Sequence, residues 1–169
     1  GYFSPYNGVG LIKEENEKYD QSLVFQSLHH QFIASAKTIE YGKDICKGKF
    51  GCMISCFCYY PLTARPEDNF KLVHDENINQ WFCADVLARG YYPSYRLKEF
   101  EREGITLPIK DGDLEIIKEG TVDFLSFSYY MSQVAAAHPE EYQQADGGNI
   151  SLGLKNPYLS SSDWGWQID

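Results

Sequence analysis

The chain has 169 residues, enough for one domain with a hydrophobic core and too few for two domains of ordinary size. Its net charge of −9 argues against a nucleic-acid-binding surface, which needs clustered Lys and Arg side chains, but not against a small phosphorylated ligand. Thirteen tyrosines are many, and aromatic rings with hydroxyls suit a sugar site as well as ordinary packing.

Three of the five cysteines, Cys52, Cys56 and Cys58, fall on one face of a single predicted strand, where neighbours are poorly placed to form a disulfide. The spacing also lacks a CxxC pair, so the sequence predicts no metal site. We interpret the cysteines as small buried hydrophobic residues in a reducing cytosol. Without a signal peptide or an apolar run that could span a bilayer, the protein is expected to be soluble, cytoplasmic and independent of a membrane.

The chain begins with residues 1–20, which resemble a loop rich in Gly, Pro and aromatic residues and look like the middle of a larger fold. A helix is predicted over residues 21–41, with Asp20 as its N-cap and Gly42 as its C-cap. Its apolar stripe consists of Val24, Phe25, Leu28, Phe32, Ile33, Ala36 and Ile39. His29 and His30 in mid-helix are expected to be packing residues and not ligands.

A buried strand is predicted over residues 49–60, followed by a loop over residues 61–69. A second helix is predicted over residues 77–89, with Ile78, Trp81, Phe82 and Val86 on one stripe and Gly90 closing it. Ser94 is expected to cap a third helix that ends at Glu103 and Gly104, with Leu97 and Phe100 pointing inward. A last helical turn is predicted over residues 113–119.

Residues 121–132 predict a second strand, buried on both faces in a parallel sheet and followed by a long polar loop. It ends in hydroxyl-bearing residues between Ser128 and Ser132, at the strand end where α/β folds bind ligands. The alternative is that these tyrosines merely pack under a loop. Trp164 and Trp166 indicate a short strand or a lip over a site, either as a stacking platform or as plain core.

The order helix, strand, helices, strand describes one α/β unit with two parallel strands and a right-handed crossover. Two strands are too few for a closed sheet, because a (β/α)8 barrel takes about 250 residues. The sequence therefore predicts a piece of a larger fold.

Five stretches together resemble one family: SLHHQFIASAKTIEYGK, FGCMI followed by YYPLTARPEDN, ADVLARGYYPSY, DGDLEIIKEGTVDFLSFSYYMS and NPYLSSSDWGWQID. Over nearly its whole length the chain is similar to bacterial 6-phospho-β-glucosidases of glycoside hydrolase family 1, whose fold is a (β/α)8 TIM barrel. The resemblance implies that residues 1–169 form a single incomplete segment of that barrel, from about helix four to strand six and the following loop.

The resemblance implies a retaining hydrolase of phosphorylated β-glucosides, such as cellobiose 6-phosphate, that releases glucose 6-phosphate without a cofactor. Such enzymes use two glutamates about 5 Å apart. In the family, the acid/base lies in an Asn-Glu motif that would precede Gly1, and the nucleophile in a Glu-Asn-Gly motif that would follow Asp169. Neither predicted strand ends in a carboxylate; the nearby acids are Glu67 and Asp68 in a loop, Glu40 on a helix and Asp123 early in its strand. The isolated chain is therefore expected to be inactive.

Tyr130 matches the second tyrosine of the family's Asn-Tyr-Tyr motif, which hydrogen-bonds the nucleophile, although Ser128 stands in place of the Asn. Tyr129, Trp164 and Trp166 are the expected substrate-binding residues. The groups that grip the phosphate would lie outside the chain, and preference for gluco over galacto substrates stays open. The rival interpretation is a non-enzymatic, truncated product that self-associates through its exposed strand edges, with at most residual sugar binding.

Overall fold

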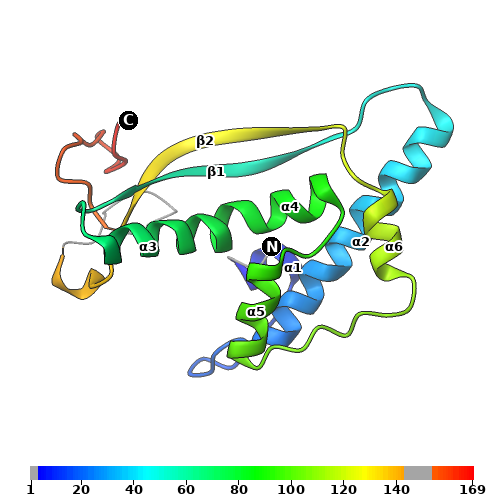
Figure 1. Ribbon diagram of the computed structural model, residues 1–169, viewed down its shortest axis with the longest axis horizontal. Helices are drawn as coiled ribbons and strands as arrows, with labels where there is room; N and C mark the ends of the chain where they lie inside the picture. Colours follow the sequence, from blue (N-terminus) through cyan, green and yellow to red (C-terminus); the bar gives the residue numbers. More distant parts are fainter. Residues whose placement is uncertain (1–3, 143–153) are drawn as a thin grey trace. The chain divides into compact units, whose positions relative to one another are not determined.

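The structure, a computed structural model, describes residues 4–142 and 154–169. The chain divides into two compact units, the first formed by Gly1–Cys52 and Phe82–Leu125 and the second by Met53–Trp81 and Ser126–Asp169. The main elements, shown in Figure 1, are α1 (Pro5–Val9), α2 (Gln21–Ile45), β1 (Gly51–Pro61), α3 (Pro66–Glu76), a π-helix (Asn77–Trp81), α4 (Phe82–Arg89), α5 (Ser94–Glu103), α6 (Asp113–Glu119), β2 (Phe124–Ala135) and a 3-10 turn (Pro139–Glu141).

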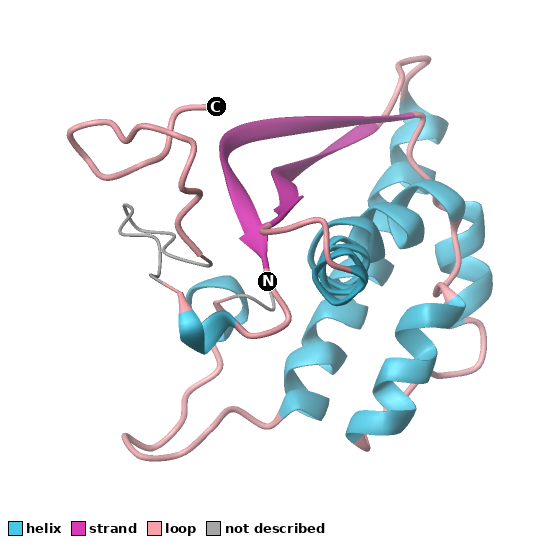
Figure 2. Cartoon of the chain, turned by 60° about the vertical axis from the view of Figure 1, so that its left-hand side comes forward, coloured by secondary structure: helices cyan, strands magenta, loops and turns pink. Residues whose placement is uncertain are grey.

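The predicted order of helix, strand, helices and strand is confirmed. β1 and β2 form a two-stranded sheet and run in the same direction (Figures 1 and 2). Main-chain hydrogen bonds join the strands near both ends, from Asp123 N to Phe50 O (2.6 Å) and from Leu62 N to Ala135 O (2.9 Å). The carboxyl ends of both strands therefore lie side by side in the second unit.

Helix α2 begins as predicted, because the carboxylate of Asp20 accepts hydrogen bonds from Ser22 N (2.8 Å) and Leu23 N (3.4 Å). The predicted stripe is buried, except that Ile33 is half-buried. The predicted end is wrong: the helix continues to Ile45, and Gly42 is a buried interior residue. A Cβ on Gly42 would come closer than 3.0 Å to the ring of Phe50, so this glycine serves close packing and not a turn.

The core of the first unit lies between α2, α4, α5 and α6. Its buried members are Phe25, Leu28, Phe32, Phe82, Val86, Tyr92, Phe100, Ile105 and Ile117. The guanidinium of Arg96 is buried there, 4.5 Å from the ring centre of Phe25 and 4.4 Å from that of Phe100. A buried cation over two aromatic faces is stabilised by cation–π attraction.

His29 is fully buried in this core, as a packing residue should be, whereas His30 is exposed. The Nδ1 atom of His29 lies 2.9 Å from the hydroxyl of Tyr92, and its Nε2 atom lies 3.0 Å from Oδ2 of Asp113. Both ring nitrogens are therefore paired, and the histidine joins α2 to the turn before α5 and to the start of α6.

The smaller helices of the first unit correct several details. Residues 5–9 form the short helix α1 where a loop was predicted, since Pro5 can open a helix. Pro93, and not Ser94, is the N-cap of α5, and Leu97 is 44% exposed instead of pointing inward. The predicted inward position of Phe100 and the predicted bounds of α6 are confirmed.

Helix α3 of the second unit was missed. The predicted loop over residues 61–69 ends at Arg65, and the helix begins at Pro66, well before Asn77. The sequence from Pro66 to Asp68 is a common helix start. Proline is tolerated in the first turn because the N–H that it lacks would have no partner there, and the two acids that follow interact favourably with the helix dipole. Glu67 and Asp68 therefore lie on a helix and not in a loop. Trp81, predicted on the buried stripe, is 48% exposed.

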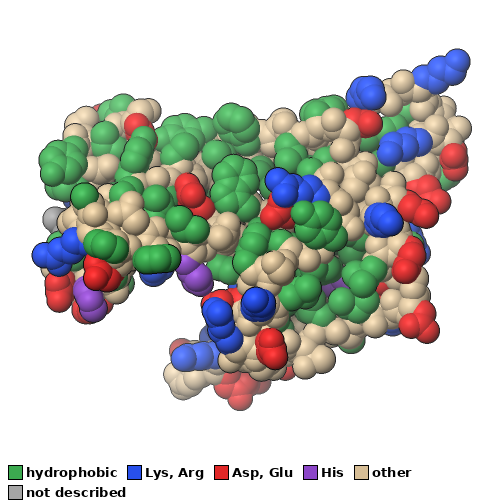
Figure 3. Space-filling model, in the orientation of Figure 1, with side chains coloured by type: hydrophobic (Ala, Val, Ile, Leu, Met, Phe, Trp, Pro, Cys, Tyr) green, Lys and Arg blue, Asp and Glu red, His purple; other side chains and the backbone are tan. Residues whose placement is uncertain are grey.

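The prediction that both strands are buried on both faces is wrong for this chain. Phe57 is the one buried residue of β1, and in β2 burial begins only at Met131. Large apolar side chains such as Met53, Phe124 and Phe127 stay exposed, and hydrophobic side chains gather on the face shown in Figure 3. Within the described residues the sheet has only two strands, so each outer edge lacks a neighbouring strand.

The prediction that the cysteines are buried is also wrong. Cys46 and Cys58 are exposed and the other three are half-buried, so they are not buried hydrophobic residues in this chain. The structure has no disulfide between any of the five. Burial still raises the pKa of the Cys83 thiol to about 12, which keeps it protonated.

Candidate functional site

Two tyrosines from different strands converge on one carboxylate, Tyr60 near the carboxyl end of β1 and Tyr129 in the middle of β2. The prediction that the second strand ends in the hydroxyl-bearing residues 128–132 is wrong, because β2 continues to Ala135. The hydroxyl of Tyr60 donates to Oδ2 of Asp169 at 3.1 Å, and the hydroxyl of Tyr129 donates to the same oxygen at 3.2 Å. Burial, and then the charge of Asp169, raise the pKa of Tyr129 to about 12. The hydrogen bond to Asp169 is the main cause that raises the pKa of Tyr60. Both phenols are therefore neutral donors at physiological pH.

The neighbouring tyrosine contacts a tryptophan from the end of the chain. The rings of Tyr130 and Trp166 are 6.0 Å apart at an interplanar angle of 71°, an edge-to-face arrangement that favours aromatic pairs. Tyr130 itself is 45% exposed. A partly exposed phenol next to a strand end can reach a group that approaches from outside the described residues.

The predicted lip is a small hairpin-like turn. Ser161 and Gln167 form an antiparallel bridge, Ser162 N donates to Trp166 O (2.8 Å), and Ile168 N donates to Ser160 O (2.9 Å). Gly165 has φ +81°, which the tight turn requires and which other residues rarely adopt. We call residues 160–168 the tryptophan turn.

The two tryptophans of this turn differ. Trp164 is 84% exposed, whereas Trp166 is half-buried against Tyr130. The two interpretations left open by the sequence therefore apply one to each residue: Trp164 has the free ring that stacking needs, and Trp166 packs. The buried amide of Gln167 fixes the turn to the preceding segment, because it accepts from Asn156 N and donates to Asn156 O, both at 2.7 Å.

A buried carboxylate connects the loops after the two strands. Asp68 accepts a hydrogen bond from the hydroxyl of Thr63 at 2.5 Å and from Ala137 N at 2.9 Å. These bonds hold its pKa below the ordinary value, so it stays ionised. Sequence reasoning placed Asp68 among the loop acids and missed this connection, although the helix-start pattern beginning at Pro66 was a usable signal.

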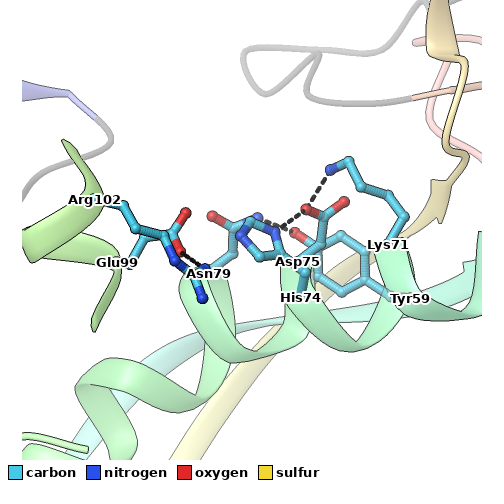
Figure 4. Close-up of polar contacts among 7 residues, drawn as sticks. All are labelled: Tyr59, Lys71, His74, Asp75, Asn79, Glu99 and Arg102. Carbon is cyan, nitrogen blue, oxygen red and sulfur yellow. Dashed lines mark hydrogen bonds and ion pairs between the residues drawn. The ribbon is translucent and has the colours of Figure 1, made fainter. Parts of the chain in front are cut away.

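The π-helix that follows α3 turns two successive amides toward β1. Gln80 is buried and its Oε1 accepts from Phe57 N at 3.1 Å, and Asn79 donates to the hydroxyl of Tyr59 at 3.1 Å (Figure 4). Burial raises the pKa of Tyr59 to about 12. In the same view Asp75 pairs with Lys71 on the adjacent turn of α3. The bonds of Gln80 and Asn79 fasten the π-helix to the strand, whereas the Lys71–Asp75 pair lies within α3.

Carboxylates lie at both ends of the sheet, but in the described residues none is the last residue of a strand. β1 ends at Pro61 and β2 at Ala135, so neither strand ends on an acid. Asp123 accepts from Phe50 N (2.8 Å) at the opposite end of the sheet. Asp169 does lie at the strand ends and was missed by the sequence reasoning. The described residues that could gather around a metal ion, His138, Glu140 and Glu141, are all exposed.

The comparison with known families gives one result over almost the whole chain. The model described as "Glycosyl hydrolase family 1" matches residues 3–169. The chain belongs to glycosyl hydrolase family 1. Among the described residues of this family 1 chain, no helix is long and apolar enough to cross a membrane.

Several similar proteins carry phospho-glycosidase names. The aryl-phospho-β-D-glucosidase BglH of Bacillus subtilis is 46% identical over 167 residues, which cover 98% of this chain and 35% of that protein. The 6-phospho-β-glucosidase AscB of Escherichia coli is 41% identical, with 98% and 34% covered. A 6-phospho-β-galactosidase of Clostridium acetobutylicum is 30% identical, with 89% and 36% covered. The family 1 chain thus spans about a third of the length of these relatives.

Solved structures agree at the level of the fold. A family 1 β-glucosidase from Thermotoga maritima superposes with a TM-score of 0.67 at 22% identity, covering 92% of this chain and 33% of the other. The β-glucosidase BglU from Micrococcus antarcticus gives a TM-score of 0.73 at 20% identity, covering 89% and 35%. The family 1 chain therefore has the fold of part of these enzymes.

Proposed function

We propose that this chain is the central part of a retaining phospho-β-glucosidase, which hydrolyses phosphorylated β-glucosides such as cellobiose 6-phosphate. The carrying observation is the 46% identity to an aryl-phospho-β-D-glucosidase over 98% of the chain.

In this proposal residues 1–169 are one incomplete segment of a (β/α)8 barrel. Two parallel strands with helices between them support it, as does the coverage of 35% of the relative BglH. In such barrels the site lies at the carboxyl ends of the strands. Tyr60, Tyr129 and Tyr130 lie toward those ends here, so this part of the second unit would face the substrate.

The isolated chain is proposed to be inactive. A retaining glycosidase needs one carboxyl as acid/base and a second as nucleophile. In the described residues neither strand ends on an acid that could supply this pair. Both catalytic glutamates would come from chain outside residues 1–169.

Tyr130 is proposed to hydrogen-bond the nucleophilic carboxylate, which would keep that carboxylate ionised and aligned. Its partly exposed ring, steadied by Trp166, supports this role. Tyr129, Trp164 and Trp166 are proposed to border the sugar. The exposed ring of Trp164 supports stacking on a substrate, whereas Tyr129 and Trp166 would act through the packing they already make.

The alternative is a non-enzymatic module that self-associates. The exposed apolar side chains of β1 and β2 favour it, because unpaired strands with apolar faces invite pairing with another copy. This alternative concerns the isolated chain and is compatible with the enzymatic role of a longer one.

A chimera tests the proposed function. Residues 1–169 would replace the matching segment of BglH, and the chimera would be assayed with an aryl 6-phospho-β-glucoside and with the unphosphorylated glucoside. Turnover selective for the phosphorylated substrate supports the proposal. A folded chimera that hydrolyses neither substrate, beside an active BglH, would contradict it.

A second chimera carries Tyr130→Phe. Loss of one hydrogen bond to the nucleophile predicts a fall in kcat of about 10²-fold with little change in KM. Tyr158→Phe, which changes a fully exposed tyrosine, is the matched control and should leave both parameters unchanged. An unchanged kcat for Tyr130→Phe would remove this residue from the site.

A further inference from the structure

We propose that Asp169 is a positioning residue that joins the carboxyl end of β1 and the middle of β2 to the tryptophan turn. The role rests on the proposed function, because its purpose would be to hold Tyr129, Tyr130 and the turn in place for substrate. It assigns a task to a carboxylate that is not one of the proposed catalytic pair.

The first observation is convergence on a single oxygen. The hydroxyls of Tyr60 and Tyr129 come from different strands, and both lie within 3.2 Å of Oδ2 of Asp169. A carboxylate has room for several donors, and hydrogen bonds to a charged acceptor are stronger than neutral ones. Asp169 therefore connects the carboxyl end of β1 to the middle of β2 through side chains.

The second observation is that Asp169 is itself held in place. Ile168 N donates to Ser160 O at 2.9 Å, and the bridge between Ser161 and Gln167 closes the turn just before it. Gln167 is buried and bonded on both sides of its amide to Asn156. The backbone next to this carboxylate is thus held in place by hydrogen bonds. The bonds from the carboxylate to the two tyrosines therefore fix where their hydroxyls lie relative to the tryptophan turn.

The third observation is that the same segment contacts the next residue of β2. Trp166 packs edge-to-face on Tyr130, while Asp169 binds Tyr129. Consecutive residues of a strand point to opposite faces. Trp166 and Asp169 therefore contact side chains on opposite faces of β2. Rotation of Tyr130 is then restrained by its own partner and by the fixed neighbour.

Nearby ionisable groups are few and do not compete for this role. Cys58 acts on both tyrosines through its charge, but that contribution ranks below Asp169 for each of them. The carboxylate of Asp169 is therefore the dominant polar partner of both phenols.

The test uses the chain itself and needs no turnover. Amide hydrogen exchange at neutral pH would be compared for wild type, Asp169→Asn and Asp169→Glu, with Asp163→Asn as the matched control. Asp163 is an exposed acid in the same turn. We expect Asp169→Asn to speed exchange of the Ile168 amide about tenfold, since two charge-assisted bonds are weakened. Asp169→Glu should restore part of the protection, and Asp163→Asn should change nothing.

A spectroscopic readout separates positioning from general destabilisation. With the tyrosine rings labelled at Cζ with carbon-13, the Tyr60 signal should titrate at lower pH in Asp169→Asn than in wild type, because its main raising cause is gone. The titration of Tyr129 should move less, because burial contributes more than Asp169 to its raised pKa. Tyr60→Phe and Tyr129→Phe assign the two signals.

A mutant cycle completes the test. In a Tyr60→Phe, Tyr129→Phe background, Asp169→Asn should have no further effect on exchange of the turn. If Asp169→Asn changes neither the Tyr60 titration nor the turn, or if its effect persists without the two hydroxyls, the positioning role is wrong. Such a failure would leave the phospho-glucosidase proposal standing, and an inactive chimera would leave the Asp169 contacts standing.

Discussion

His29 shows how a single buried polar residue can hold three elements together. It has no exposed surface, and its two ring nitrogens contact Tyr92 and Asp113. Replacing it leaves a cavity and two groups whose buried partner is lost.

We therefore expect His29→Ala to lower the free energy of unfolding by about 2–4 kcal/mol. Urea denaturation at pH 7 measures this, with His30→Ala as the control. His30 is exposed on the same helix, so that change should cost less than about 0.5 kcal/mol. Equal effects of the two substitutions would refute the structural role of the buried ring.

The contacts of Asp68 predict that the stability of the chain depends on pH. Its bonds to Thr63 and Ala137 lower its folded-state pKa below the ordinary value of 3.8. The stability that it contributes is therefore present above the unfolded-state pKa and is lost as pH falls through the folded-state pKa.

Asp68→Asn should accordingly weaken the loss of stability between pH 5 and pH 2, measured as the change in urea midpoint. Glu67→Gln is the matched control, since Glu67 is exposed in the same helical turn. If both variants lose stability with acid as steeply as wild type, the Asp68 contacts do not contribute as described.

At the scale of elements, two glycines are required for close packing between elements, which the sequence pattern did not reveal. Gly42 was predicted to end its helix, but it lies inside α2. Gly120 does follow α6, yet its φ is not left-handed, and a Cβ there would meet the backbone of Ala36 closer than 3.0 Å. A glycine required for close approach looks the same in a sequence as a glycine required for a turn.

Gly120→Ala should therefore destabilise the chain by about 2 kcal/mol or more, because backbone atoms of α2 cannot move aside easily. Gly48→Ala, where a Cβ meets only the Cys46 sulfur at an ordinary distance, is the control and should be neutral. Thermal unfolding followed by circular dichroism compares them. A neutral Gly120→Ala would show that α6 does not pack so closely on α2.

The helices with a clear apolar periodicity or a clear capping residue could be predicted from the sequence. The stripe of α2, its Asp20 cap and the bounds of α6 follow from local spacing alone. Helix α3 was missed because its apolar periodicity is weak and a proline opens it. Strand burial was wrong because burial depends on neighbours that a local pattern does not contain. Asp169 could not be placed at the site, since its contacts with Tyr60 and Tyr129 join residues far apart in the chain.

At the scale of the whole molecule, the exposed sheet predicts association. Phe127 is 67% exposed and Met53 60% exposed, on strands without further described neighbours. We expect the purified chain to sediment as dimers or larger species, and Phe127→Lys to shift it toward monomer by adding charge to the apolar face. Lys47→Glu, which alters an exposed charge away from the sheet, should leave the distribution unchanged. A monomeric wild type at all concentrations would contradict this expectation.

Hydrolysis of an aryl 6-phospho-β-glucoside by the purified chain, with the unphosphorylated glucoside beside it, tests the central claim most directly. That claim is that residues 1–169 supply supporting groups of a phospho-β-glucosidase site but neither catalytic carboxylate. The expected result is no turnover of either substrate, while BglH in the same assay is active. Turnover selective for the phosphorylated substrate would show that carboxylates of this chain form a catalytic pair and would overturn the claim.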